Sequence, residues 1–192
     1  MKRGFKAHAE REAARVRTDL GLPAAAPLPS RDLASKLAVR LISPLEIPDL
    51  SGAHLEALRQ DAGSWSAVTL PALDPVCIIY NPFHAATRHE SDIMHELAHL
   101  LCDHRPDGVM TLGGLPCRSF SKVHEEEAAW LGATLQAPRV ALMALFRRGM
   151  SVAQVAAHLG CSEVLVRYRR DVTGVERQVG RAGWRPARAK VP

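Results

Sequence analysis

The sequence lacks the features that mark a secreted or membrane protein. No apolar run approaches the roughly 20 residues needed to cross a bilayer. The opening stretch MKRGFKAHAEREAARVRTDLGL has no apolar core of the kind found in signal peptides. No C-x-x-C pair occurs either, because the four cysteines are scattered at Cys77, Cys102, Cys117 and Cys161. We therefore expect a soluble cytoplasmic protein with reduced thiols.

The composition has no strong bias. With 192 residues, 47% hydrophobic and 23% charged, the chain suits one medium domain, or a domain with a small appendage. The formal net charge of +5 is compatible with nucleic acid or an acidic protein as a partner. It is too small to indicate either one.

The first part of the chain is predicted to be helical. Apolar residues recur at helical spacing over residues 5–20, and Ser30 is suited to cap a second helix over 31–39. The next stretch contains Pro44 and Pro48, so we expect it to be irregular.

A small sheet and a longer helix should follow. SAVTL at 66–70 and VCIIY at 76–80 are typical of strands, and PALDP between them carries turn residues. Thr87 and Glu90 fit a capping box, which predicts a helix from about residue 88.

Residues 103–121 are rich in Gly, Pro and Ser and are predicted to form a loop. A helix is expected over 122–136, and another from Pro138 to Gly149. Two short helices split at LGCS come next.

We divide the chain into three parts on this basis. Residues 1–138 would form the main domain and residues 139–176 a helical region. Residues 177–192 are basic and contain Gly and Pro, which predicts a mobile tail.

The helix expected from residue 88 carries His95-Glu96-Leu97-Ala98-His99, an HExxH pattern. Two histidines four apart lie on one helical face and can bind one zinc ion, while Glu96 reaches the bound water as general base. The alternative is an ordinary surface helix. However, IMHELAHLLC is otherwise apolar, and burying these groups without partners would cost on the order of several kcal/mol. The pattern favours a metal site.

A catalytic zinc site needs a third protein ligand, and helix 122–136 offers three consecutive glutamates. Glu127 lies on the apolar face that includes Trp130, whereas Glu125 and Glu126 fall off it. A carboxylate on an apolar face requires a partner, so Glu127 is the predicted ligand. The helix dipole is sufficient to explain the other two.

These residues predict metal-assisted peptide hydrolysis. Zinc lowers the pKa of its water to about 7, and Glu96 would accept the proton and pass it to the leaving amine. We expect one Zn²⁺ per chain. Mn²⁺ or Fe²⁺ also suits two histidines and a glutamate.

Other candidates are weaker. Cys102 shares the ligand face of its helix but is explained as a small hydrophobe. His124, one turn before Glu127, could support the ligands, although an exposed histidine is an equal explanation. Tyr80 and Asn81 end a strand that could border the cleft and pair with a peptide.

The segment SVAQVAAHLGCSEVLVRYRRD has the spacing of a helix-turn-helix, with Gly160 at the turn and Ser162 capping the second helix. Arg167, Arg169 and Arg170 would then be the DNA contacts. The alternative is a helical hairpin packed on the catalytic unit. That alternative is favoured because Arg169 occupies a position that is usually apolar in such motifs.

Taken together, these segments resemble the ImmA/IrrE family of metallopeptidases. The likeness spans GFKAHAEREAARVRTDLGL, IIYNPFHAATRHESDIMHELAHLLCDH, EEEAAWLGATLQAP and SVAQVAAHLGCSEVLVRYRR. The family's HExxH residues match His95, Glu96 and His99, and its Glu-Ala pair matches Glu127-Ala128.

The match departs just after that pair. The family usually has Asn or Asp next and an aromatic residue two positions later, where this chain has Ala129 and Leu131. The departure concerns the wall of the cleft rather than the ligands.

The resemblance implies an α+β, mainly helical, zincin-like minimal metallopeptidase. A small β-sheet would lie beside the HExxH helix, with a helix-turn-helix-like region following. It also implies a zinc-dependent, site-specific endopeptidase that cleaves a helix-turn-helix repressor in a mobile-element or DNA-damage response. The alternative function is a DNA-binding or protein-binding regulator, or a toxin–antitoxin partner, in which the metal site is structural or vestigial.

Overall fold

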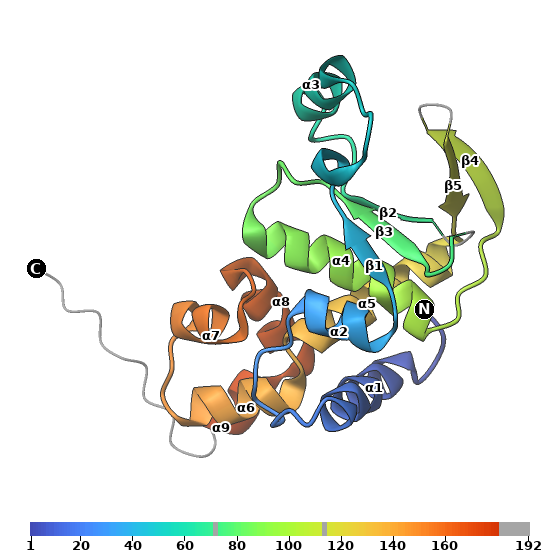
Figure 1. Ribbon diagram of the computed structural model, residues 1–192. Helices are drawn as coiled ribbons and strands as arrows, with labels where there is room; N and C mark the ends of the chain where they lie inside the picture. Colours follow the sequence, from blue (N-terminus) through green and yellow to red (C-terminus); the bar gives the residue numbers. More distant parts are fainter. Residues whose placement is uncertain (71–72, 113–114, 181–192) are drawn as a thin grey trace, which may run out of the picture.

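Two long helices, α4 (Ala86–Leu101) and α5 (Lys122–Gln136), pack against each other and carry the candidate site (Figure 1). They belong to a computed structural model that describes residues 1–70, 73–112 and 115–180. The other elements, in chain order, are α1 (Phe5–Asp19), α2 (Ser30–Lys36), β1 (Arg40–Ile42), the 3-10 helix η1 (Pro44–Glu46), α3 (Gly52–Gln60), β2 (Ala67–Leu70), β3 (Cys77–Tyr80), β4 (Gly108–Leu112), β5 (Leu115–Ser119), α6 (Arg139–Arg147), α7 (Val152–Leu159), α8 (Glu163–Thr173) and α9 (Val175–Gly180).

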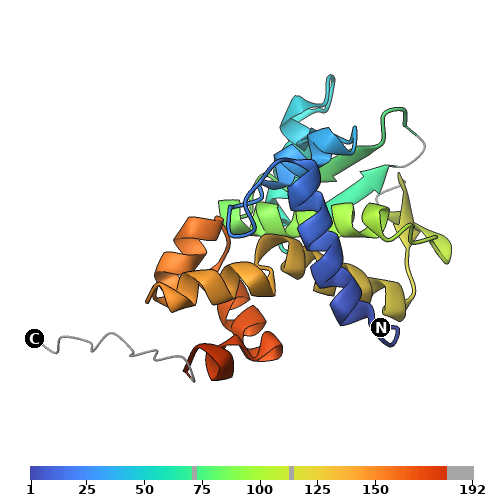
Figure 2. The ribbon, with the colours of Figure 1, turned by 90° about the horizontal axis from the view of Figure 1, so that it is seen from below.

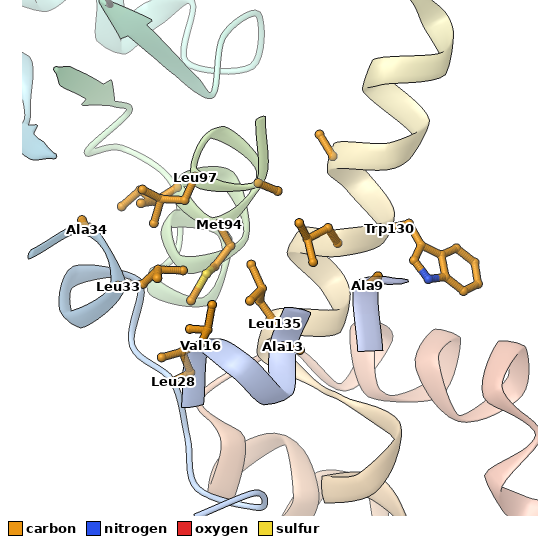
Figure 3. Packing of buried hydrophobic residues seen from close by; sticks show 14 of the residues in the cluster. Ala9, Ala13, Val16, Leu28, Leu33, Ala34, Met94, Leu97, Trp130 and Leu135 are labelled. Carbon is orange, nitrogen blue, oxygen red and sulfur yellow. The ribbon is translucent and has the colours of Figure 1, made fainter. Parts of the chain in front are cut away.

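Helix α1 confirms the helix predicted over 5–20. Its buried face, which includes Ala9, Ala13 and Val16, packs against α5. Figure 3 shows Ala13 and Val16 close to Leu135 of α5 and Met94 of α4. Small residues on α1 thus let three helices share one apolar core.

The sheet confirms the predicted α+β class and contains one strand more than expected. Its order is β1-β3-β2, with β1 parallel and β2 antiparallel to β3. The two predicted strands correspond to β2 and β3. The extra strand, β1, has only three residues, which is too short for an alternating pattern to be recognised.

Two further elements were missed. The predicted loop 103–121 contains the antiparallel hairpin β4–β5, in which Thr111 pairs with Pro116. A two-stranded ribbon has only edge strands, so it tolerates a proline that a central strand would not. Helix α3 lies in a stretch for which no helix was predicted, and none of its residues is buried.

Helix starts also differ in detail. Helix α4 begins two residues before the predicted start, and its cap residue Ala85 offers no side-chain cap. Glu90 does not close a capping box, because its carboxylate accepts a hydrogen bond from the Ser30 backbone at 2.7 Å. Ser30 itself is the first residue of α2, and Pro29 precedes it. A hydrogen bond between α2 and α4 therefore takes the place of the predicted capping box within α4.

The buried apolar residues form two clusters. The first joins α1, α2, the sheet, α4 and α5, and the second joins α6, α7, α8 and α9. Figure 2 shows the second group lying together to one side of α1. The first cluster ends at Leu135 and the second begins at Ala137, so the predicted boundary at 138 falls between them. That this boundary separates domains stays a prediction.

The predicted tail 177–192 begins too early, because α9 continues to Gly180 and Val179 is buried in the second cluster. The rest of that tail, 181–192, lies outside the described residues. Within the described chain, no helix is both long and apolar enough to span a bilayer.

Candidate metal centre

The two histidines of the HExxH pattern converge at one end of α4. His95 and His99 lie one helical turn apart, and their Nε2 atoms are 3.1 Å from each other. His99 is buried, whereas the His95 side chain is 29% exposed. Two imidazole nitrogens therefore point at the same spot, one from the interior and one from the surface.

Glu125 of α5 completes this cluster. Its Oε2 lies 3.2 Å from His95 Nε2, and its Oε1 lies 3.5 Å from His99 Nε2. A tetrahedral ion with bonds of 2.0–2.1 Å separates its ligands by about 3.3 Å. The three donors are therefore spaced as ligands of a single metal ion would be. Among the described residues, they form the one His, Cys, Asp or Glu group close enough to share an ion.

Glu127, the glutamate that periodicity selected, does not join the histidines. It is buried, as its place on the apolar face implied, but its carboxylate faces another way along α5. Oε1 accepts a hydrogen bond of 2.7 Å from the Lys2 backbone, and Oε2 lies 3.4 Å from His104 Nε2. The position identified a carboxylate that needs a partner, but these contacts do not support its assignment as a metal ligand.

The environment of Glu127 keeps it ionised. Burial alone would raise its pKa, but the hydrogen bond from Lys2 and the contact with His104 outweigh that effect and lower it. Burial, together with the neighbouring His124, lowers the pKa of His104. His104 is therefore suited to be neutral at physiological pH.

Glu96 points from α4 toward the sheet. Its Oε2 accepts a hydrogen bond of 2.5 Å from Thr69 Oγ1 on β2. Burial raises the pKa of the Glu96 carboxyl, and the Thr69 hydrogen bond offsets part of that rise. A carboxylate with a raised pKa is a better proton acceptor than an ordinary one. Thr69 has no signature in the sequence, because only the packing of β2 on α4 brings it to Glu96.

A cavity of about 440 Å³ opens beside His95 and Glu96. Its α5 side is formed by the small residues Ala129, Gly132 and Ala133, together with Gln136. Leu165 of α8 also lines it. Helix α8 thus contributes a side chain to the cavity next to the candidate metal site.

The cleft residues expected from the sequence are mostly structural. Asn81 is buried, and its amide donates to the carbonyls of Ala62 and Trp65. The Tyr80 hydroxyl accepts a hydrogen bond of 3.0 Å from Arg31. Neither residue lines the cavity beside Glu96, so a substrate contact from them is not supported.

His124 lies near the candidate site without being within it. Its ring stacks on that of His104, with centroids 4.4 Å apart and planes 14° apart. Its backbone N–H donates a hydrogen bond to the hydroxyl of Ser121, the residue that caps α5. Its predicted support of the ligands is therefore indirect.

The arginines of α8 do not form a basic face. Arg169 is fully buried, and its guanidinium bonds the Glu10 carboxylate at 2.5 Å and the Ala137 carbonyl at 3.1 Å. Its predicted role as a DNA contact is therefore wrong. Arg167 pairs with Glu163 and Arg170 with Asp171.

The surface of α8 is also apolar where a DNA-reading helix would be basic. Val164, Tyr168 and Val172 are exposed at positions one turn apart. Gly160 ends α7 with a φ of 70°, and Ser162 caps α8, as the sequence predicted. DNA binding by this pair of helices stays a prediction.

The fold and the His–His–Glu cluster together define a metallopeptidase with a mainly helical, α+β, minimal zincin-like architecture. Residues 48–170 match the family model described as the IrrE N-terminal-like domain, a peptidase family. Because this match covers more than half of the chain, the protein belongs to the ImmA/IrrE family of metallopeptidases. No curated protein and no solved structure matches the chain.

Proposed function

We propose that this protein is a zinc-dependent, site-specific endopeptidase whose substrate is a helix-turn-helix repressor. The observation that carries the proposal is the spacing of His95, His99 and Glu125, whose donor atoms lie 3.1–3.5 Å apart. Two histidines and a carboxylate are the ligand set of catalytic zinc sites, which keep a fourth position open. A closed structural site would have a fourth protein ligand instead.

The residues around the site suit peptide hydrolysis. His95, His99 and Glu125 would hold the zinc ion, which would supply a water with a pKa of about 7 and polarise the substrate carbonyl. Glu96 takes the proton from the attacking water and delivers it to the leaving nitrogen, a role favoured by its raised pKa. Thr69 holds one carboxylate oxygen, so the other is left to accept the proton.

The substrate class rests on the family and on the shape of the cleft. Enzymes resembling this one cut repressors, and such a cut would derepress the genes of a mobile element or a damage response. The 440 Å³ cavity beside Glu96 is large enough to receive a side chain of an unfolded or looped segment. Fold-level likeness does not identify the particular repressor.

A cleavage assay tests the proposal. The purified protein should bind about one zinc per chain, since its site has three ligands. It should cut a helix-turn-helix protein encoded next to it at one position. Glu96→Gln should keep the zinc but lose about 10²–10⁴-fold in rate, the usual contribution of a general acid–base group.

Glu56→Gln provides the matched control, because Glu56 is an exposed carboxylate on α3 that pairs with Arg59. It should cut at the wild-type rate. Full activity of Glu96→Gln would refute the mechanism.

One observation favours the alternative of a regulator that binds without cutting. The exposed apolar residues of α8, Val164, Tyr168 and Val172, suit a protein partner better than DNA. A repressor that binds the zinc-loaded protein and stays intact would support this alternative.

A further inference from the structure

The ring nitrogen of His99 that faces away from the metal site has a specific neighbour. His99 Nε2 lies next to His95 Nε2 and Glu125, so Nδ1 points into the protein. There it lies 3.1 Å from Nδ1 of His104. Metal-ligating histidines generally donate the N–H of the other ring nitrogen to an acceptor, which fixes the tautomer and the ring orientation.

The two Nδ1 atoms determine where the protons lie. A neutral His99 that ligates through Nε2 carries its proton on Nδ1 and donates it to His104. His104 Nδ1 must then be the acceptor, and the proton of His104 lies on Nε2. That nitrogen is buried and has no hydrogen-bond partner of good geometry among the described residues.

Glu127 Oε2 lies 3.4 Å from His104 Nε2. This separation is a close electrostatic contact, longer than a well-formed hydrogen bond. The other oxygen of Glu127 is held at 2.7 Å by the Lys2 backbone N–H. The carboxylate is therefore fixed in place, with its charge next to the nitrogen of His104 that must carry the proton.

Stacking holds the two rings in this arrangement. Phe120 lies over His99 with centroids 3.9 Å apart, and His124 lies over His104 at 4.4 Å. Each ring is therefore covered on one face by its stacking partner. The His99 and His104 rings themselves meet edge-on.

We propose that His104 and Glu127 are positioning residues, and that the charge of Glu127 fixes the tautomer of His104, which in turn orients His99 as a metal ligand. This inference rests on the proposed function, since it takes His99 to be a ligand. It also gives Glu127 a defined role: the buried carboxylate acts on the metal site through His104 and does not bind the ion.

A pair of identical substitutions tests the proposal. His104→Phe keeps the stacked ring but removes the acceptor for His99 Nδ1–H, so zinc affinity should fall by about 10–100-fold. His124→Phe replaces the other ring of the His104–His124 stack. It keeps the His104 acceptor, so zinc affinity should be unchanged. Zinc dissociation constants are measured by competition with a chelator, and thermal unfolding of the metal-free variants checks that both fold.

A rescue variant separates positioning from packing. In His104→Asn the amide oxygen can take the place of Nδ1 as acceptor, so this variant should recover most of the affinity that His104→Phe loses. Wild-type affinity in His104→Phe, or equal losses in His104→Asn and His104→Phe, would overturn the proposal.

The outcome is distinguishable from failure of the proposed function. A wild-type protein that binds no zinc would refute the metal site itself. A protein with the expected order of zinc affinities that cuts no repressor would refute the proposed substrate and leave the positioning role supported.

Discussion

The two apolar clusters of this protein differ in how they treat polar side chains. The first surrounds buried or half-buried polar groups in two sets, one in which His104 lies between His99 and Glu127 and one in which Thr69 donates a hydrogen bond to Glu96. The second is a cluster of apolar residues, and beside it the buried guanidinium of Arg169 bonds Glu10 of α1 and the Ala137 carbonyl at the end of α5. The polar groups of the candidate site therefore lie with the first cluster. The second cluster contacts that region through Arg169.

Helix α5 is the element that the two regions share. Its first turn presents Glu125 to the histidines, where the helix dipole favours a carboxylate. At its other end, Arg17 of α1 bonds the Leu135 carbonyl at 2.8 Å and Arg169 of α8 bonds the Ala137 carbonyl. Burial lowers the pKa of Arg17 to about 10, which still leaves it charged at neutral pH. Two buried cations thus satisfy the carbonyls at the negative end of α5.

The largest expected effect lies within the first region. Glu125→Gln should weaken zinc binding by more than about 100-fold, the upper end of losses seen when only a supporting partner is removed. Glu126→Gln is the control, because Glu126 is also exposed on the first turns of α5 but faces away from the histidines. Metal analysis after dialysis measures both. Complete zinc loss in Glu127→Gln but not in Glu125→Gln would restore the ligand that periodicity predicted.

An intermediate effect should come from the second region and leave the metal untouched. Arg169→Met removes a buried cation and leaves the Ala137 carbonyl without its donor. We expect a loss of about 2–3 kcal/mol in the free energy of unfolding, below the full cost of breaking a buried pair because Glu10 is partly exposed. Zinc affinity of the folded variant should be unchanged.

Arg167→Met provides the comparison, since this arginine is exposed and pairs with Glu163 in the same helix. Its effect should stay within about 0.5 kcal/mol. Urea denaturation measures both variants. Equal losses in the free energy of unfolding for Arg169→Met and Arg167→Met would mean that the contacts of Arg169 with α5 do not stabilise the protein.

The sequence was informative where a pattern is local. Helical spacing located α1, α4 and α5, and the HExxH pattern located His95 and His99 without any fold. The choice among three consecutive glutamates depends on tertiary structure as well as on the local pattern. Periodicity finds the buried one, Glu127, whereas the one that meets the histidines depends on how α5 crosses α4. Arg169 shows the same limit, because its position in the chain implied an apolar environment but only the fold supplies Glu10 as its partner.

The smallest expected changes in stability come from two glycines with different roles, Gly132 in α5 and Gly160 at the end of α7. A Cβ on Gly132 of α5 would lie 3.1 Å from the Met94 carbonyl oxygen and 3.3 Å from the His95 Cα, so this glycine allows the two ligand-bearing helices to approach closely. In Gly132→Ala, overpacking of about 1–3 kcal/mol is partly offset by the gain of about 1 kcal/mol for alanine in a helix. The net change in stability should be small, but displacing α5 from His95 should weaken zinc binding.

Gly160 has open space around it and a φ of +70°, so Gly160→Ala should cost about 1 kcal/mol in stability and nothing in zinc affinity. If Gly132→Ala bound zinc as tightly as Gly160→Ala, the close approach of α4 and α5 would not be what sets the metal geometry.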